Sequence, residues 1–207
     1  MTGSPHLETV ACLGSSTTAS RGTYKWIDEL ERRPHNSRFR FVNLGVGGDL
    51  SANAVRRLDR VIAQRPDRVI VLIGSNDIMA SVFPNFRRFV RVIKRLRDEP
   101  TPERFDENLA VIVRRLQREA DARVALSSLA PVGEEPGSRH PVQARLNDLF
   151  STYNGIIRKA AAHPRRHRDK ALGEGPALVK QRLTCDEQTQ NRTARAVRVR
   201  FCVCSPG

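Results

Sequence analysis

Short apolar runs alternate with amphipathic helical patterns along residues 8–162 of this 207-residue chain. The clearest run, Asp67–Ile73, is β-branched and apolar on both faces, as expected of a central parallel strand. Apolar residues at helical spacing between the runs predict amphipathic helices. Strands are expected over Thr9–Leu13, Arg38–Leu44, Asp67–Ile73 and Arg123–Leu129. Helices are expected over 24–33, within 81–102, over 103–119 and over 143–162, and a further helix that Asp49 or Ser51 caps is expected to continue to about 62.

Strands that alternate with helices through short loops predict a parallel sheet with helices on both sides. The predicted fold class is therefore α/β, a three-layer α/β/α sandwich. Glycines and small polar residues follow three of the strands, in the segments Gly14–Thr18, Asn43–Asp49 and Gly74–Asp77. Because the carboxyl ends of parallel strands meet at one edge of a sheet, we expect a single site at that edge.

The segment Phe86–Arg97 predicts a basic amphipathic helix. One face carries apolar side chains, and Arg and Lys residues cover much of the remainder. We favour a helix whose apolar face packs on the domain and whose basic face is solvated. The alternatives are a lid and a weak contact with an anionic surface. The expected apolar face consists of Phe86, Phe89, Val90, Ile93 and Leu96.

The periodicity fails from about residue 164, which predicts one folded domain over residues 1–163 and a basic irregular tail over 164–207. This tail holds ten Lys and Arg residues against four Asp and Glu. Two hypotheses remain open for it: translation in a shifted reading frame, and a naturally disordered basic tail. The cysteines of the tail slightly favour the first hypothesis.

The formal net charge of +14 raises nucleic acid as a partner. We expect no nucleic-acid binding, because aromatic residues are few and no basic stretch has the aromatic interleaving that stacks on bases. Cys12 is expected in the core, and Cys185, Cys202 and Cys204 are too sparse for a zinc site, so no metal is expected. The chain also lacks an apolar run long enough for a membrane span and a basic-then-apolar N-terminus, which predicts a cytoplasmic location.

The three polar segments together resemble conserved blocks of the SGNH/GDSL hydrolases, a family of esterases and lipases. Gly14–Thr18 is similar to Gly-Asp-Ser-x-Thr, Asn43–Asp49 to Asn-x-Gly-x-x-Gly-Asp, and Gly74–Asp77 to Gly-x-Asn-Asp. The resemblance covers about residues 8–162 and implies the flavodoxin-like SGNH fold. It also implies acyl-ester hydrolysis without a cofactor, with Ser16 as nucleophile and Gly48 and Asn76 as oxyanion-hole donors for a small-molecule ester substrate.

Two departures from the family pattern change the expected activity. Ser15 replaces the Asp of the first block, a position whose side chain is not the nucleophile. More seriously, the chain contains no Asp-x-x-His, the block that supplies the general base. We therefore assign no base, and we expect impaired catalysis and a fold that lacks its last strand and helix.

Each of the three segments also has a purely structural interpretation. Ser16, or Asn76 with Asp77, can cap a helix, and the glycines at 45, 47 and 48 can simply form a turn. The alternative function is a non-catalytic α/β binding module that uses the same donors for an anion or an acyl group.

Overall fold

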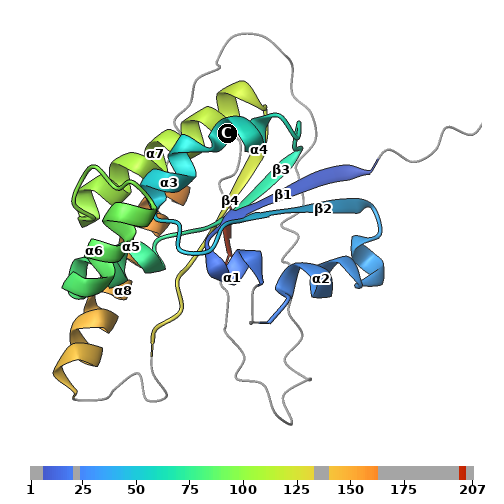
Figure 1. The fold of residues 1–207 in the computed structure, drawn as a ribbon. Coiled ribbons are helices and arrows are strands. Elements are labelled where there is room, and N and C mark those ends of the chain that lie inside the picture. The colour runs from blue at the N-terminus through green and yellow to red at the C-terminus, as the bar shows by residue number, and fades with distance from the viewer. Residues whose placement is uncertain (1–6, 21–23, 133–139, 163–200, 204–207) are drawn as a thin grey trace, which may run out of the picture.

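The computed structural model describes residues 7–20, 24–132, 140–162 and 201–203, and its sheet has the strand order β2-β1-β3-β4-β5 (Figure 1). The first four strands are parallel to one another, as predicted. Their order places β1 between β2 and β3, so the ends of all three strands that precede the polar segments are neighbours. The bounds are Glu8–Gly14 for β1, Phe39–Gly45 for β2, Arg68–Leu72 for β3 and Arg123–Ser127 for β4.

The fifth strand, β5 (Phe201–Val203), pairs antiparallel with the outer edge of β4. The sequence predicts no strand in this segment and an entirely parallel sheet, so these three residues differ from the prediction. The remainder of the predicted tail, and with it the question of a shifted reading frame, lies outside the described residues.

Helices cover both faces of the sheet, which confirms the three-layer α/β/α sandwich (Figure 1). A large apolar core joins one face to the later helices, and a smaller cluster around Cys12 and Ile27 covers the other face beside α2. The helices are α1 (Ser16–Ala19), α2 (Trp26–Glu31), η1 (Pro34–Asn36), α3 (Ser51–Arg56), α4 (Leu58–Ile62), α5 (Ser75–Val82), α6 (Pro84–Ile93), α7 (Pro102–Glu119) and α8 (Pro141–Ala162).

Two helical predictions differ from the structure. The single helix expected to end near residue 62 is broken at Arg57, whose φ of −115° and ψ of 15° are not helical. The predicted helix over 24–33 is shorter, because it ends before the 3-10 turn that begins at Pro34. Helix α5, which no apolar pattern predicts, follows β3 directly.

The predicted apolar face of α6 is wrong in part. Val90 and Leu96 are buried and Phe86 packs against them, but Phe89 and Ile93 are exposed. The helix therefore contacts the domain along a narrower strip than its sequence predicts.

Cys12 lies fully buried on β1, as predicted, and its side chain is a free thiol. Loss of solvent raises its pKa to about 12, so it is inert as a nucleophile near neutral pH. None of the helices in the described ranges has the length and apolar character needed to span a bilayer. The cytoplasmic location stays a prediction.

Candidate active site

The hydroxyl of Ser16 lies at the carboxyl end of the inner strand β1. The strand ends at Gly14, and α1 begins at Ser16 itself, so the residue that precedes this helix as its N-cap is Ser15. Ser16 is exposed, and its side chain has no hydrogen-bond partner among the described residues. Ser16 is therefore not the helix cap, and its hydroxyl is free to meet a ligand. Because α1 is a single turn of four residues, its dipole adds little there.

The turn after β2 holds Gly48. This turn starts beside the end of β1, because Gly14 and Gly45 are register partners and the Val46 N–H donates to the Gly14 carbonyl at 3.0 Å. Gly48 has a φ of +75°, which residues with a side chain rarely adopt. A Cβ at this position would also lie 3.2 Å from Cε of Lys94. The backbone conformation thus requires a glycine here, independently of any approach by a substrate.

Asn76 connects the end of β3 to this same turn. Gly74, with a φ of +126°, leads from the strand into α5, and Asn76 is the second residue of that helix. The Asn76 Nδ2 donates to the carbonyl oxygen of Asp49 at 2.9 Å. The side-chain amide therefore lies beside the residue that follows Gly48. The structure brings the three predicted strand ends to one edge of the sheet.

A charged network that the sequence did not single out holds these strand ends together. The Arg57 guanidinium donates to the Leu44 carbonyl at 2.6 Å, to the Gly14 carbonyl at 2.8 Å and to Oδ2 of Asp49 at 2.6 Å. Lys94 Nζ lies 2.9 Å from the other Asp49 oxygen. The Asp49 carboxylate is buried, and two cations compensate its charge. The sequence carries no signal that pairs Asp49 with Arg57, which lies eight positions away.

Asp77 caps a neighbouring helix, α3, rather than its own. Its carboxylate accepts hydrogen bonds from the Ser51 N–H at 3.0 Å and from the Ser51 hydroxyl at 2.5 Å. Asn108 on α7 donates to the same hydroxyl oxygen at 3.0 Å. The expectation that Asp49 or Ser51 caps this helix is wrong, since the N-cap position is occupied by Leu50 and Ser51 is the first helical residue. Asp77, in the segment Gly74–Asp77, thus holds the start of α3, which follows the segment Asn43–Asp49.

Burial raises the pKa of the Asp77 carboxyl from 3.8 to about 6, and the hydrogen bonds from Ser51 only partly oppose this shift. Between these two pH values the folded protein holds the proton more tightly than the unfolded chain, so stability falls as pH rises through 6. From about pH 4.5 to about pH 7.5, the wild-type protein is expected to lose about 2 kcal/mol of unfolding free energy that an Asp77→Asn variant does not lose. Urea unfolding at both pH values measures this difference, and an equal change in the two proteins would contradict the prediction.

No described histidine serves Ser16 as a base. His35 lies on η1 and His140 precedes α8; both are exposed, and neither hydrogen-bonds to the serine hydroxyl. The late histidines at 163 and 167 lie outside the described residues. The described residues also contain no group of three or more His, Cys, Asp or Glu side chains placed to hold a metal ion.

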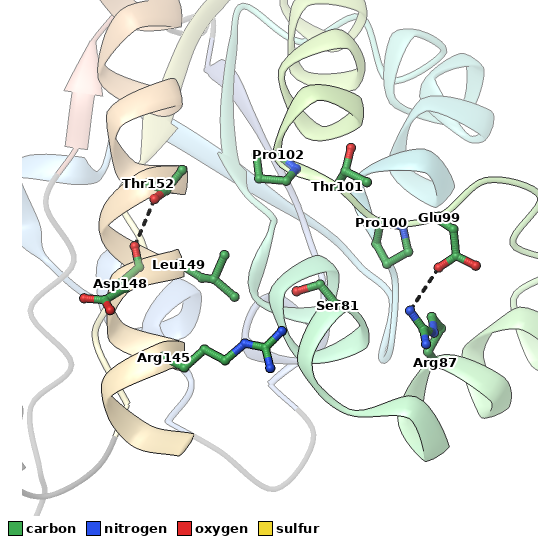
Figure 2. Close-up of a pocket in the computed structure, with 10 residues that line it drawn as sticks. All are labelled: Ser81, Arg87, Glu99, Pro100, Thr101, Pro102, Arg145, Asp148, Leu149 and Thr152. Atoms are coloured by element: carbon green, nitrogen blue, oxygen red, sulfur yellow. Dashed lines mark hydrogen bonds and ion pairs between the residues drawn. The ribbon is translucent and has the colours of Figure 1, made fainter. Parts of the chain in front are cut away.

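A pocket of about 520 Å³ lies between α5, α6, the start of α7 and α8 (Figure 2). Arg145 extends into it from α8, and Arg87 pairs with Glu99 on the opposite side at 3.2 Å. None of Ser16, Gly48 and Asn76 lines this pocket. It is therefore separate from the strand ends.

A parallel sheet between helical layers, with three polar strand ends at one edge, defines an α/β protein of the SGNH hydrolase type. The model of the GDSL-like lipase/acylhydrolase family matches residues 12–182, and the chain belongs to this family. No curated protein matches the sequence.

Solved structures share the fold at low sequence identity. The acetyl xylan esterase AlAXEase is 20% identical with a TM-score of 0.55, and the alignment covers 74% of this chain and 72% of that one. Axe2, an acetylxylan esterase from Geobacillus stearothermophilus, is 18% identical with a TM-score of 0.58, over 77% and 75% of the two chains. TesA is 23% identical with a TM-score of 0.50, over 74% of each chain.

Proposed function

We propose that this protein is a serine hydrolase that cleaves small acyl esters through an acyl-Ser16 intermediate. The observation that carries the proposal is the meeting of the three strand ends. An exposed serine whose hydroxyl bonds to no described residue follows β1, and the Asn76 amide is bonded to the turn that contains Gly48. Membership of a lipase and acylhydrolase family supports the same chemistry.

In the proposed reaction, the Ser16 oxygen attacks the acyl carbonyl carbon and its proton passes to a base. The backbone N–H groups of Ser16 and Gly48 and the side-chain amide of Asn76 donate hydrogen bonds to the oxyanion that forms. Collapse of this intermediate expels the alcohol, which takes up the proton, and water then releases the acid from the acyl-enzyme. Each fixed donor contributes about 10²–10³ in rate, because it is already oriented when the charge develops.

The base is the missing part of this machinery. The described residues supply no histidine to Ser16, and the sequence contains no Asp-x-x-His. Without a general base Ser16 is a weak nucleophile, and its attack on an ester or a fluorophosphonate depends on the oxyanion hole alone. We therefore expect slow turnover rather than none.

The second candidate function is a non-catalytic binding module on the same fold. In this alternative, the donors at the strand ends hold an anion or an acyl group without breaking a bond. The same observation favours it: no described side chain activates the Ser16 hydroxyl.

Covalent labelling separates the two functions. We expect a fluorophosphonate to add once to the purified full chain, as read by intact mass, and the adduct to be absent from Ser16→Ala. Ser15→Ala is the matched control: Ser15 is buried, its side chain makes no capping hydrogen bond, and labelling should persist. Acetyl esters are the first substrates to test, because two structural neighbours are named acetylxylan esterases.

Two results would contradict the proposed hydrolase. A folded wild-type protein that forms no adduct, and that hydrolyses p-nitrophenyl acetate no faster than Ser16→Ala does, would overturn the hydrolase and leave the binding module. An adduct that persists in Ser16→Ala would place the reactive group elsewhere.

A further inference from the structure

Helix α6 carries an apolar patch that the rest of the described chain leaves uncovered. Phe89 is 58% exposed, Val92 74% and Ile93 61%. Their spacing of three and four residues places them on one face of the helix. Val90, the one buried residue of α6, lies on another side. An apolar cluster of this kind on a surface helix marks a contact site.

Four exposed arginines accompany this α6 patch along the chain. Arg88 and Arg91 lie on the helix, and Arg95 and Arg97 follow its end; all four are exposed. Arg91 pairs with Glu99, whereas Arg88, Arg95 and Arg97 form no ion pair within the described residues. The nearby carboxylates are already engaged, because Glu99 also binds Arg87 and Asp98 lies 3.8 Å from Arg104. The charges of Arg88, Arg95 and Arg97 are therefore not neutralised by any described carboxylate.

The opposite side of α6 is anchored, so the patch has a fixed direction. Val90 and Leu96 are buried in a cluster with Leu50 and Ala80. At the end of the helix, the Lys94 carbonyl accepts a hydrogen bond from Asn53 Nδ2 at 3.1 Å. The Lys94 side chain binds Asp49 at 2.9 Å. The helix therefore cannot easily turn its apolar side chains inward.

We propose that this face of α6 docks on an anionic lipid surface. Phe89, Val92 and Ile93 enter the boundary between headgroups and acyl chains, as the apolar side of an interfacial helix does. Arg88, Arg95 and Arg97 place their guanidinium groups at the lipid phosphates while their stems cover apolar surface. An apolar patch with unpaired arginines on the same helix and directly after it complements such a surface in both polarity and charge. A nucleic acid fits less well, because only one aromatic side chain in the patch is available for stacking.

The end of helix α6, on the side away from the patch, contacts the candidate site. Lys94, directly after α6, is the residue whose Cε would lie 3.2 Å from a Cβ on Gly48. Docking through α6 would therefore leave this helix between the membrane and the turn that contains Gly48. The lipid contact itself requires no catalysis, so it is tested independently of the proposed hydrolase.

Co-sedimentation with vesicles tests the proposal. The full chain is expected to bind vesicles of phosphatidylcholine mixed equally with phosphatidylglycerol, and to bind phosphatidylcholine alone only weakly. Phe89→Ser/Val92→Ser/Ile93→Ser is expected to weaken binding to the mixed vesicles by about tenfold or more. Arg88→Gln/Arg95→Gln/Arg97→Gln is expected to weaken it by about a hundredfold. Both variants retain residues 164–207, so any contribution of that basic segment is common to all proteins compared.

A matched charge control uses Arg114, Arg118 and Arg123, which are exposed near the end of α7 and the start of β4 and have no ion-pair partner among the described residues. Replacing these three by Gln should change vesicle binding far less than the α6 variants do. Thermal unfolding should be near wild type for all variants, because the changed residues are exposed. Wild-type protein that fails to bind the mixed vesicles, or an apolar variant that binds them as well as wild type, would overturn the proposal. A dimeric wild type that becomes monomeric in the apolar variant, without vesicle binding, would instead make this face a contact between copies of the chain.

Discussion

Replacement of Gly45 by alanine is expected to cost about 3 kcal/mol of unfolding free energy and to abolish fluorophosphonate labelling of Ser16. A Cβ at position 45 would lie 2.2 Å from the Ala19 backbone nitrogen and 2.5 Å from the Thr18 carbonyl carbon. These are backbone atoms of α1, so no side-chain rotation relieves the overlap. The helix that begins with Ser16 must move away from β2. Urea unfolding measures the stability, and intact mass measures the labelling.

Gly47→Ala is the matched control in the same turn. No atom lies within 4 Å of a Cβ at this position, and its φ is not positive. The change is therefore expected to alter stability by less than about 1 kcal/mol. Equal effects of the two substitutions would show that α1 is not packed tightly on β2.

Arg57→Met is expected to cost about 3 kcal/mol and to slow the labelling of Ser16 more than the lost stability explains. The substitution keeps most of the apolar stem but removes the donors to Gly14, Leu44 and Asp49. The Asp49 carboxylate then depends on Lys94 alone. Both carbonyls lose a donor at the strand ends, and the turn of Gly48 is released from β1. Urea unfolding and the rate of fluorophosphonate addition measure the two effects.

Arg60→Met provides the control, because it removes the same charge from an exposed position one turn away. It should leave both measurements near wild type. Arg57→Lys should have a stability and a labelling rate between those of wild type and Arg57→Met. Its ammonium group restores a charge for Asp49 but does not reach all three acceptors, which are Asp49 and the carbonyls of Gly14 and Leu44. If Arg57→Met and Arg60→Met behave alike, the network does not organise the strand ends.

The oxyanion-hole donors and the missing base belong to different parts of the chain. Gly14, Ser16, Gly48, Arg57 and Asn76 all come from the first half of the sequence. Arg57 donates to the Gly14 carbonyl, and Asn76 donates to the carbonyl of Asp49, the residue after Gly48. The family's base would follow a later strand. The oxyanion-hole donors can therefore be intact in a protein whose turnover is slow. Covalent labelling of Ser16 tests these donors more directly than turnover does.

Local pattern was sufficient to predict the four parallel strands and the core of the long helices. The stripe on α8 is an example: Leu146, Phe150, Tyr153 and Ile157 recur at helical spacing, and all are buried. Burial follows directly from such spacing, because one face of a helix must leave water. The sequence also predicted that the three polar segments meet, because parallel strands bring their carboxyl ends to one edge of the sheet.

The sequence by itself thus determined the fold class, the family and the edge of the sheet where Ser16, Gly48 and Asn76 gather. Only the tertiary structure decided which charges are partners: Arg57 with Asp49, and Asp77 with Ser51. These residues are 8 and 26 positions apart, and the side of the helix on which an arginine lies does not say which carboxylate it will meet. It also decided that Phe89 and Ile93 face outward, because α6 is fixed by contacts at Val90 and at its far end rather than by its own amphipathic pattern.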